Sequence, residues 1–263
     1  MPDLDNRGKI AAAEIAFYAP AALVACALFA RYAFHYESGW VFTLLFSSVR
    51  IVCGALILAA ELSSSSTANL YTAAYVMFET DLGLLLISAL GYLGLAGYHT
   101  YSSLYQTMTY FRITAFFCLA AMIITAVGGG LQANDPSSKE IKTGKTLRRV
   151  GAVLFMVIWC FMVFLHLYAY SFRWEMRYSH RRFLAFLFLA MAFLGVRCVY
   201  QILDVWSSAD IYGLRLSSNS HIVKFQPVTG DYVTWLVMGL IMEYVAVVIY
   251  LAGSIDVVIH RRR

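Results

Sequence analysis

Ionisable side chains that could carry acid–base chemistry lie inside apolar stretches of this sequence. The residues concerned are Arg50, Glu61, Glu79, Asp81, Arg112, Arg197, Asp204, Glu243 and Asp256. A charge at the centre of a lipid bilayer costs at least ~2.5–3.5 kcal/mol, so residues of this kind by default indicate a function. A carboxyl group kept from water favours its neutral form and can then donate a proton. The set therefore indicates general acid–base chemistry inside a membrane.

Acids outnumber bases in the part of this set that gathers toward one membrane face. The acids there are Glu61, Glu79, Asp81, Asp204 and Glu243, and the bases are Arg50 and Arg197. Two carboxylates can pair with the arginines, and the others must reach water, bind a cation or stay protonated. A protonated acid among them is a candidate general acid. The structural alternative is that the arginines join helices and the spare acids face a wet crevice.

Residue spacing predicts which of these side chains share a helix face. One stripe follows the i, i+3, i+4, i+7 pattern and consists of Arg197, Tyr200, Gln201 and Asp204. Arg50 and Glu61 are eleven residues apart, a separation that returns to nearly the same face of a helix. Glu79 and Asp81 are two residues apart, so only one of them can point straight into a common site.

Seven apolar stretches must position these residues, and each is long enough to cross a bilayer as a helix of about 20 residues. They cover 12–34, 41–62, 71–97, 109–132, 147–171, 182–206 and 232–258. Of the 263 residues, 61% are hydrophobic and 13% are charged, whereas soluble chains carry about 25% charged residues. We predict an all-α, polytopic membrane protein in which residues 1–263 form a single domain, one bundle of seven transmembrane helices. The first stretch is longer than the apolar core of a signal peptide, so we interpret it as the first helix.

The direction of each helix predicts how deep the charged residues lie. With the N-terminal side named side A, a rise of about 1.5 Å per residue places Arg50 and Glu243 near mid-depth and Asp204 near the A edge. The polar residues left near the opposite side, side B, are Arg112, His166 and Asp256. We therefore expect a pocket that is closed toward side B and opens toward side A. Aromatic residues beside it would stabilise cations, although aromatic side chains also anchor membrane proteins at the interface.

The spans contain little that could hold a cofactor. All the lysines lie outside them, which excludes a Schiff base to retinal, and His166 is the only histidine well inside a span, which excludes a bis-histidine haem. The sequence has no HExxH motif, no glycine-rich phosphate loop, no Cys–His metal spacing and no Asp-rich DDxxD motif. We expect a site that works without metal or cofactor.

Basic residues between and at the ends of the spans predict contacts with lipid and a membrane orientation. One run extends from the segment after the fourth stretch into the start of the fifth and consists of Lys139, Lys142, Lys145, Arg148 and Arg149. We interpret these residues as loop charge that suits lipid phosphates, and nothing in the sequence indicates nucleic-acid binding. Lys and Arg are nearly balanced between the two sides, and the basic tail 261–263 favours a cytosolic C-terminus.

The segment Arg50–Glu61 (RIVCGALILAAE), which follows the turn at 38–40, carries a family resemblance. It resembles the second helix of a fungal seven-helix membrane family similar to the integral-membrane terpene cyclases of meroterpenoid pathways, of the ascofuranone and macrophorin kind. That resemblance implies proton-initiated cyclisation of a prenyl (farnesyl) chain or its epoxide, without metal, in the endoplasmic reticulum. The pocket must be dry, because water would quench the cation.

The resemblance also implies roles for the charged residues. One carboxyl would donate the proton that starts the reaction and another would accept the proton released at its end. The candidates for this acid–base work are Asp204, Glu243, Glu79, Asp81 and Glu61. The residues expected to hold the acids or a polar head group of the substrate are Arg50, Arg197, Tyr200 and Gln201. The expected partners are a hydrophobic, prenylated small molecule and membrane lipids.

A second resemblance leaves the activity open. The segment Arg197–Asp204 (RCVYQILD), together with Glu243 and Asp256, resembles the RTA-like lipid-translocating exporters of fungi. In those exporters the pattern ends in Glu and carries a second arginine where this chain has Gln201. A transporter of lipids or amphiphiles is therefore the alternative to an enzyme, and a seven-helix receptor is a third reading. A cyclase requires a closed, aromatic-lined pocket with a protonated acid, whereas a transporter requires a polar path that opens to both sides.

Overall fold

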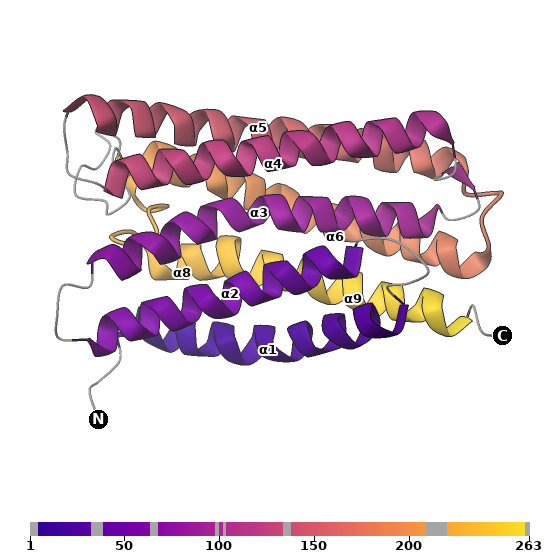
Figure 1. Cartoon of the computed structure of the whole chain (residues 1–263), viewed down its shortest axis with the longest axis horizontal. Coiled ribbons are helices and arrows are strands. Elements are labelled where there is room, and N and C mark those ends of the chain that lie inside the picture. The colour runs from indigo at the N-terminus through magenta and orange to yellow at the C-terminus, as the bar shows by residue number, and fades with distance from the viewer. Residues whose placement is uncertain are drawn as a thin grey trace.

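Long helices lie side by side and form most of the described structure (Figure 1). The computed structural model describes residues 5–32, 39–63, 68–97, 100–101, 104–133, 138–208 and 220–260. The first six long helices are α1 (Asn6–Tyr32), α2 (Gly39–Leu62), α3 (Ala68–Ala96), α4 (Tyr105–Ala133), α5 (Ser138–Ser171) and α6 (Tyr178–Ser207). The rest of the described chain forms the short α7 (Ser220–Val223), α8 (Tyr232–Thr234), the π-helix η2 (Trp235–Ile241) and α9 (Met242–His260). No strand occurs among these elements, and the prediction of an all-α bundle is confirmed.

Seven helical segments of the described chain are long and apolar enough to cross a membrane. They are Asn6–Arg31, Gly39–Leu62, Asn69–Ala96, Tyr105–Gln132, Glu140–Ser171, Tyr178–Ser207 and Tyr232–Val257. Large apolar side chains such as Leu23, Phe116 and Phe164 are exposed on the outside of the bundle. A surface of this kind is suited to lipid chains rather than to water. The chain is therefore an integral, multi-pass membrane protein.

The helix α3 forms the centre of the bundle. It contacts α2, α4, α5, α6 and α9 and is the most buried of the seven spans. The N-terminal ends of α1, α3 and α5 meet the C-terminal ends of α2, α4 and α6 at one end, side A (left in Figure 1). Ionisable residues in the side A halves of different helices are thereby brought close together.

The helix α5 begins well before the expected start at 147 and takes in the basic run that the sequence reading assigned to a loop. Gly128 of α4 lets these two helices approach closely. A Cβ atom at Gly128 would lie 2.8 Å from the backbone nitrogen of Arg148 and 3.0 Å from the carbonyl oxygen of Gly144. Backbone atoms cannot move aside as a flexible side chain can, so the crossing of α4 and α5 depends on this glycine.

Replacing Gly128 by valine is therefore expected to lower the free energy of unfolding by about 1–3 kcal/mol through overpacking. Thermal unfolding of the detergent-purified protein measures the effect. Gly130→Val is the matched control, since a Cβ atom at Gly130 meets no atom within 4 Å. Equal stability of the two variants would show that the helices do not depend on close contact at Gly128.

Candidate functional site

Arg50 joins four helices through buried ion pairs. Its side chain is fully buried on α2. The Nη1 atom lies 3.1 Å from Oε1 of Glu14 on α1, and the Nε atom lies 2.8 Å from Oδ2 of Asp81 on α3. The Nη2 atom donates to Glu243 on α9. A single guanidinium group thus holds carboxylates from three other helices.

Arg197 on α6 binds Glu243 as well, through the carboxylate oxygen that Arg50 does not bind. Its Nε atom donates to the same carboxylate, so Glu243 bridges the two arginines. The Nη1 atom donates to Oε1 of Gln201 at 2.6 Å, and the Nη2 atom donates to the backbone carbonyl of Phe78 at 3.0 Å. Every nitrogen of the Arg197 guanidinium group therefore has a protein acceptor.

The ring of Phe78 contacts both arginines. The Cζ atom of Arg50 lies 4.4 Å from the ring centroid, and that of Arg197 lies 4.7 Å from it. Cation–π attraction of this kind grows when the charge is withdrawn from water. We name these residues the central charge cluster: Glu14, Arg50, Phe78, Asp81, Arg197, Gln201 and Glu243.

The central charge cluster holds three carboxyl groups and two guanidinium groups. All five ionisable side chains are buried, so solvent does not balance the excess carboxyl. Isolated charge in a dry interior is costly, which favours an additional proton or cation at this point. An arrangement of this kind can retain a proton without a metal ion.

Arg148 forms a second buried pair next to the cluster. Its Nε atom lies 2.8 Å from Oε2 of Glu79, its Nη2 atom donates to Oε1 of the same carboxylate, and its Nη1 atom lies 2.7 Å from Oε1 of Gln132. These bonds link α5, α3 and α4. The interpretation of Arg148 as loop charge was therefore wrong, because this residue lies on α5 and its side chain is buried in the bundle.

The neighbours Glu79 and Asp81 face different partners, as their spacing predicts. Asp81 pairs with Arg50 and Glu79 pairs with Arg148. The stripe of Arg197, Tyr200, Gln201 and Asp204 is entirely buried on α6.

Glu61 lies apart from both charged groups. Its carboxyl is half-buried against Gly8 at the start of α1. Of the candidates drawn from the sequence, Arg50, Asp81, Arg197, Gln201 and Glu243 meet in one cluster.

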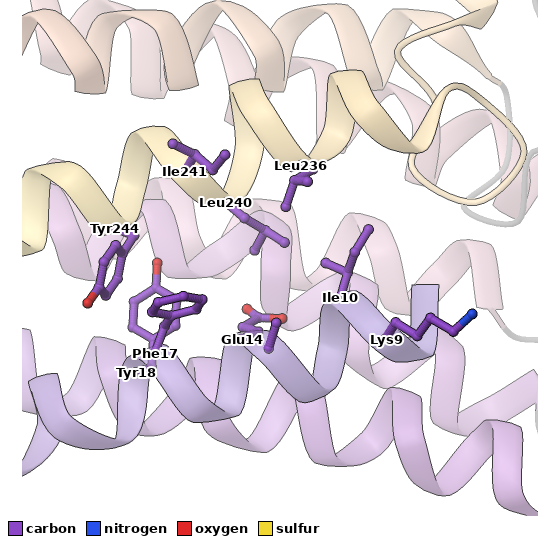
Figure 2. Close-up of a pocket in the computed structure, with 10 residues that line it drawn as sticks. Lys9, Ile10, Glu14, Phe17, Tyr18, Leu236, Leu240, Ile241 and Tyr244 are labelled. Atoms are coloured by element: carbon purple, nitrogen blue, oxygen red, sulfur yellow. The ribbon is translucent and has the colours of Figure 1, made fainter. Parts of the chain in front are cut away.

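A lateral cleft lies next to the central charge cluster. The cleft has a volume of about 450 Å³ and lies between α1 and the η2–α9 segment. The residues that line it are Lys9, Ile10, Ala13, Glu14, Phe17, Tyr18, Leu236, Leu240, Ile241 and Tyr244. Figure 2 shows Lys9 at one end, Tyr244 at the other and the Glu14 carboxyl between them. The pocket that the sequence predicts toward side A stays a prediction.

Glu14 is the one residue that belongs both to the cleft wall and to the central charge cluster. Its neighbours along the wall are apolar or aromatic, apart from Lys9 at the end of the cleft. Any molecule that enters the cleft from lipid therefore meets a single carboxyl group, which Arg50 holds from behind.

A π-helix shapes the second wall of the cleft. The segment η2 supplies Leu236, Leu240 and Ile241 to the cleft, and its Gly239 lies against Phe78, where a Cβ atom would be 3.0 Å from Cζ. Single π-helical turns are frequent at functional sites.

Asp231 fixes the chain just before the π-helix. Its carboxylate accepts hydrogen bonds from Thr234 Oγ1 at 2.8 Å and from the Val233 backbone N–H at 3.2 Å. Stabilisation of the charged form by these bonds lowers the pKa of Asp231. The cap therefore orders the start of the cleft wall when Asp231 is ionised.

A second groove lies on the other side of the η2 segment, between α5 and α6. Its volume is about 570 Å³, and the residues that line it are Trp159, Val163, Phe188, Met191, Ala192, Gly195, Val196, Val199 and Met238. None of them is ionisable. This second groove can accept an apolar chain but offers no group for acid–base chemistry.

The sequence reading missed three polar residues of this region. Glu14 lies inside the first apolar stretch, in the run Ala-Ala-Ala-Glu. This position alone was sufficient reason to count it with the other intramembrane acids. Arg148 lay inside the expected span 147–171 but was counted with the loop charges next to it. Gln132, which accepts a hydrogen bond from Arg148, is a neutral residue at the end of a span, and nothing in the sequence indicated this contact.

Among the residues that the structure describes, no three His, Cys, Asp or Glu side chains form a group that could hold a metal ion. No curated protein and no solved structure matches the chain. Residues 4–258 match a family described as a domain of unknown function, DUF7702, and since this match covers nearly the whole sequence, the chain belongs to that family.

Proposed function

We propose that this chain is a membrane-bound terpene cyclase that takes a prenyl substrate or its epoxide from the bilayer into the lateral cleft. The observation that carries the proposal is an apolar cleft that opens toward lipid and has a single carboxyl, Glu14, in its wall. Its volume of about 450 Å³ falls in the usual range for small-molecule sites, roughly 300–1,000 Å³. A hydrophobic substrate dissolved in lipid can enter such a cleft without crossing water.

The walls of the cleft suit a carbocation. Phe17, Tyr18 and Tyr244 line it, and the ring of Tyr244 lies 5.4 Å from that of Phe17 and 5.5 Å from that of Tyr18. Aromatic faces attract cations in the absence of water. Lipid on one side and apolar side chains on the other would keep water from the reacting chain, which protects the cation.

Glu14 is the proton donor in this proposal. The central charge cluster has one carboxyl more than it has guanidinium groups, and Glu14 is the member that lines the cleft. Its O–H bond breaks as the proton adds to the epoxide oxygen or to an alkene carbon, and the π-bonds of the substrate then close the rings. A C–H bond finally releases a proton to the Glu14 carboxylate, so the reaction is an isomerisation that returns the acid to its starting state.

The other charged residues support this acid rather than replace it. Arg50 holds Glu14 through Nη1, while Asp81 and Glu243 hold Arg50. Arg197 and Gln201 extend the same network away from the cleft. Asp204, Glu79 and Glu61, candidates from the sequence, are absent from the cleft wall and have no direct part in the proposed reaction.

A transporter of lipids or amphiphiles is the second candidate, because the lateral cleft opens toward lipid and a second groove lies across η2 from it. In that reading a lipid chain passes between the two surfaces when η2 moves. The family resemblance implies a fungal endoplasmic reticulum membrane, and the basic residues 261–263 favour a cytosolic C-terminus. We propose this location and orientation for the chain.

The test is an assay of microsomes from yeast that express the chain. They are supplied with a farnesylated phenol and with its terminal epoxide, and the products are followed by chromatography and mass spectrometry. A new product of unchanged mass, missing from empty-vector membranes, is expected for a cyclase. If folded protein yields no isomer from either compound, the cyclase proposal fails for prenylated phenols, and lipid-export assays then test the second candidate.

Filling the cleft is expected to stop turnover. Ala13 is exposed and lines the cleft, so an Ala13→Trp side chain would occupy the space of the substrate without disturbing the core. Its neighbour Ala12 is also exposed but does not line the cleft, which makes Ala12→Trp the matched control. Isomer formation is measured for both. Normal turnover in Ala13→Trp would place the substrate elsewhere.

A substitution in the second groove distinguishes a cyclase from a transporter. Ala192 is exposed and lines that groove. The variant Ala192→Trp is expected to retain cyclisation, whereas a transporter that passes lipid across both surfaces would lose export.

A further inference from the structure

Asp204 is a buried acid that forms no ion pair with the residues that the structure describes. Its side chain on α6 is 1% exposed, and neither carboxyl oxygen has a hydrogen-bond partner among the described residues. The polar atoms Tyr200 Oη, Gln201 Nε2 and Trp235 Nε1 are also buried without a partner. Unsatisfied buried groups are rare in folded proteins, and several on adjoining surfaces indicate that something small is held between them.

The charged groups that face Asp204 are already committed to other contacts. They are Glu79 from α3, Arg148 from α5 and Arg197 from its own helix. Arg148 binds Glu79 and Gln132, and Arg197 binds Glu243, Gln201 and the Phe78 carbonyl. Tyr75 on α3 adds a polar but neutral group to these surroundings, and Trp235 on η2 packs in one cluster with Tyr200, which also faces Asp204.

A naked carboxylate in these surroundings would be very costly. The charge must be removed by a proton or balanced by a cation. A metal ion requires several anionic or neutral ligands, and the described part of the chain has no such group of His, Cys, Asp and Glu. A proton requires only the carboxyl itself, so a proton fits the observed surroundings better.

Polar residues lead from Asp204 to the side A surface. Tyr75 interacts electrostatically with Asp204, Tyr71, Glu61 and Arg7. Tyr71 and Tyr75 are four residues apart on α3 and Glu79 follows four residues later, so these side chains succeed one another along one face at intervals of about 6 Å. Arg7 donates a hydrogen bond to the Gly230 carbonyl at 3.5 Å, at the end of the bundle where α1 begins. Hydroxyl groups in such a row can relay a proton.

We propose that Asp204 is a proton-binding site that exchanges its proton with side A through Tyr75. The site is separate from the lateral cleft, because neither residue lines that cleft. It goes beyond the proposed cyclase and does not depend on it. The Asp204 carboxyl thus lies between α3, α5 and α6 as a site that takes up a proton from water at side A and releases it to the same side.

The experiment is infrared difference spectroscopy of the full chain in lipid nanodiscs, between acidic and alkaline pH. The carbonyl stretching band of a protonated carboxyl is expected in the wild type, and Asp204→Asn is expected to remove one component. Glu14→Gln is expected to leave that component in place. If Asp204→Asn does not fold, Asp204→Glu is expected to shift the component instead. Identical spectra of the wild type and the folded Asp204 variants at every pH would overturn the proposal.

Exchange into D₂O tests the route. The Asp204 component is expected to shift as deuterium replaces the proton, and to shift more slowly in Tyr75→Phe. Tyr250→Phe is the matched control, since Tyr250 is also a buried tyrosine but lies on α9, with Tyr92 and Cys198 rather than Asp204 as its neighbours. Equal exchange rates in all three proteins would overturn the route through Tyr75. Loss of the component when Na⁺ replaces choline would show a metal cation in the site and overturn the proton assignment.

Discussion

Replacing Glu14 by glutamine is expected to abolish cyclisation while folded protein accumulates as in the wild type. Glutamine retains an oxygen that can accept the hydrogen bond from Arg50 Nη1, so the contact between α1 and α2 persists. It cannot donate a proton as the carboxylic acid does. Loss of a general acid lowers the rate by about 10²–10⁴-fold. The measurement is the initial rate of isomer formation per amount of folded protein, determined by fluorescence-detected gel filtration.

The matched control is Glu175→Gln, because Glu175 is exposed and lies outside the spans. It is expected to leave the rate unchanged. Full activity in Glu14→Gln would remove Glu14 as the donor. A wild-type rate per amount of folded protein, together with a lower yield of folded protein, would show that Glu14 acts only as a ligand of Arg50.

Hydropathy alone predicted the fold class, because seven apolar stretches in one chain leave few ways to satisfy the backbone in lipid. Helical spacing also predicted the buried stripe of α6 and the divergence of Glu79 from Asp81, since both depend only on the geometry of a single helix. Such predictions require no knowledge of how helices face each other.

The sequence could not predict which charged side chains pair with each other. The pairing of Arg50 with Glu14 depends on how α1 is rotated against α2, and the pairing of Arg148 with Glu79 depends on how α5 is rotated against α3. The lateral cleft depends on the π-helix η2, which an apolar stretch does not reveal. Glu14 could have been found from its place within an apolar run, but its importance comes from the cleft beside it.

Replacing Arg50 by methionine is expected to have the largest effect on stability. The change leaves Glu14, Asp81 and Glu243 buried without their shared cation. Removing one partner of a buried ion pair costs about 3–5 kcal/mol, because the remaining charge stays in a dry interior. Arg112→Met is the matched control, since Arg112 lies within the span on α4 but is exposed at its surface. Unfolding of the purified proteins in a denaturing detergent measures the difference.

A second substitution separates lost charge balance from lost packing. Glu14→Gln in the Arg50→Met background removes one of the carboxylates that no longer has a guanidinium partner. The double variant is expected to recover part of the free energy of unfolding that Arg50→Met loses. If the two residues did not interact, the changes in free energy of unfolding caused by Arg50→Met and by Glu14→Gln would simply add in the double variant. Wild-type stability of Arg50→Met would show that the ion pairs do not hold the helices together. A loss that Glu14→Gln does not relieve would assign the role of Arg50 to packing against Phe46 and Phe78. Because Arg50→Met is expected to destabilise the fold, a loss of its activity would not show a catalytic role for Arg50, and the chemical role of the cluster must be judged from Glu14→Gln.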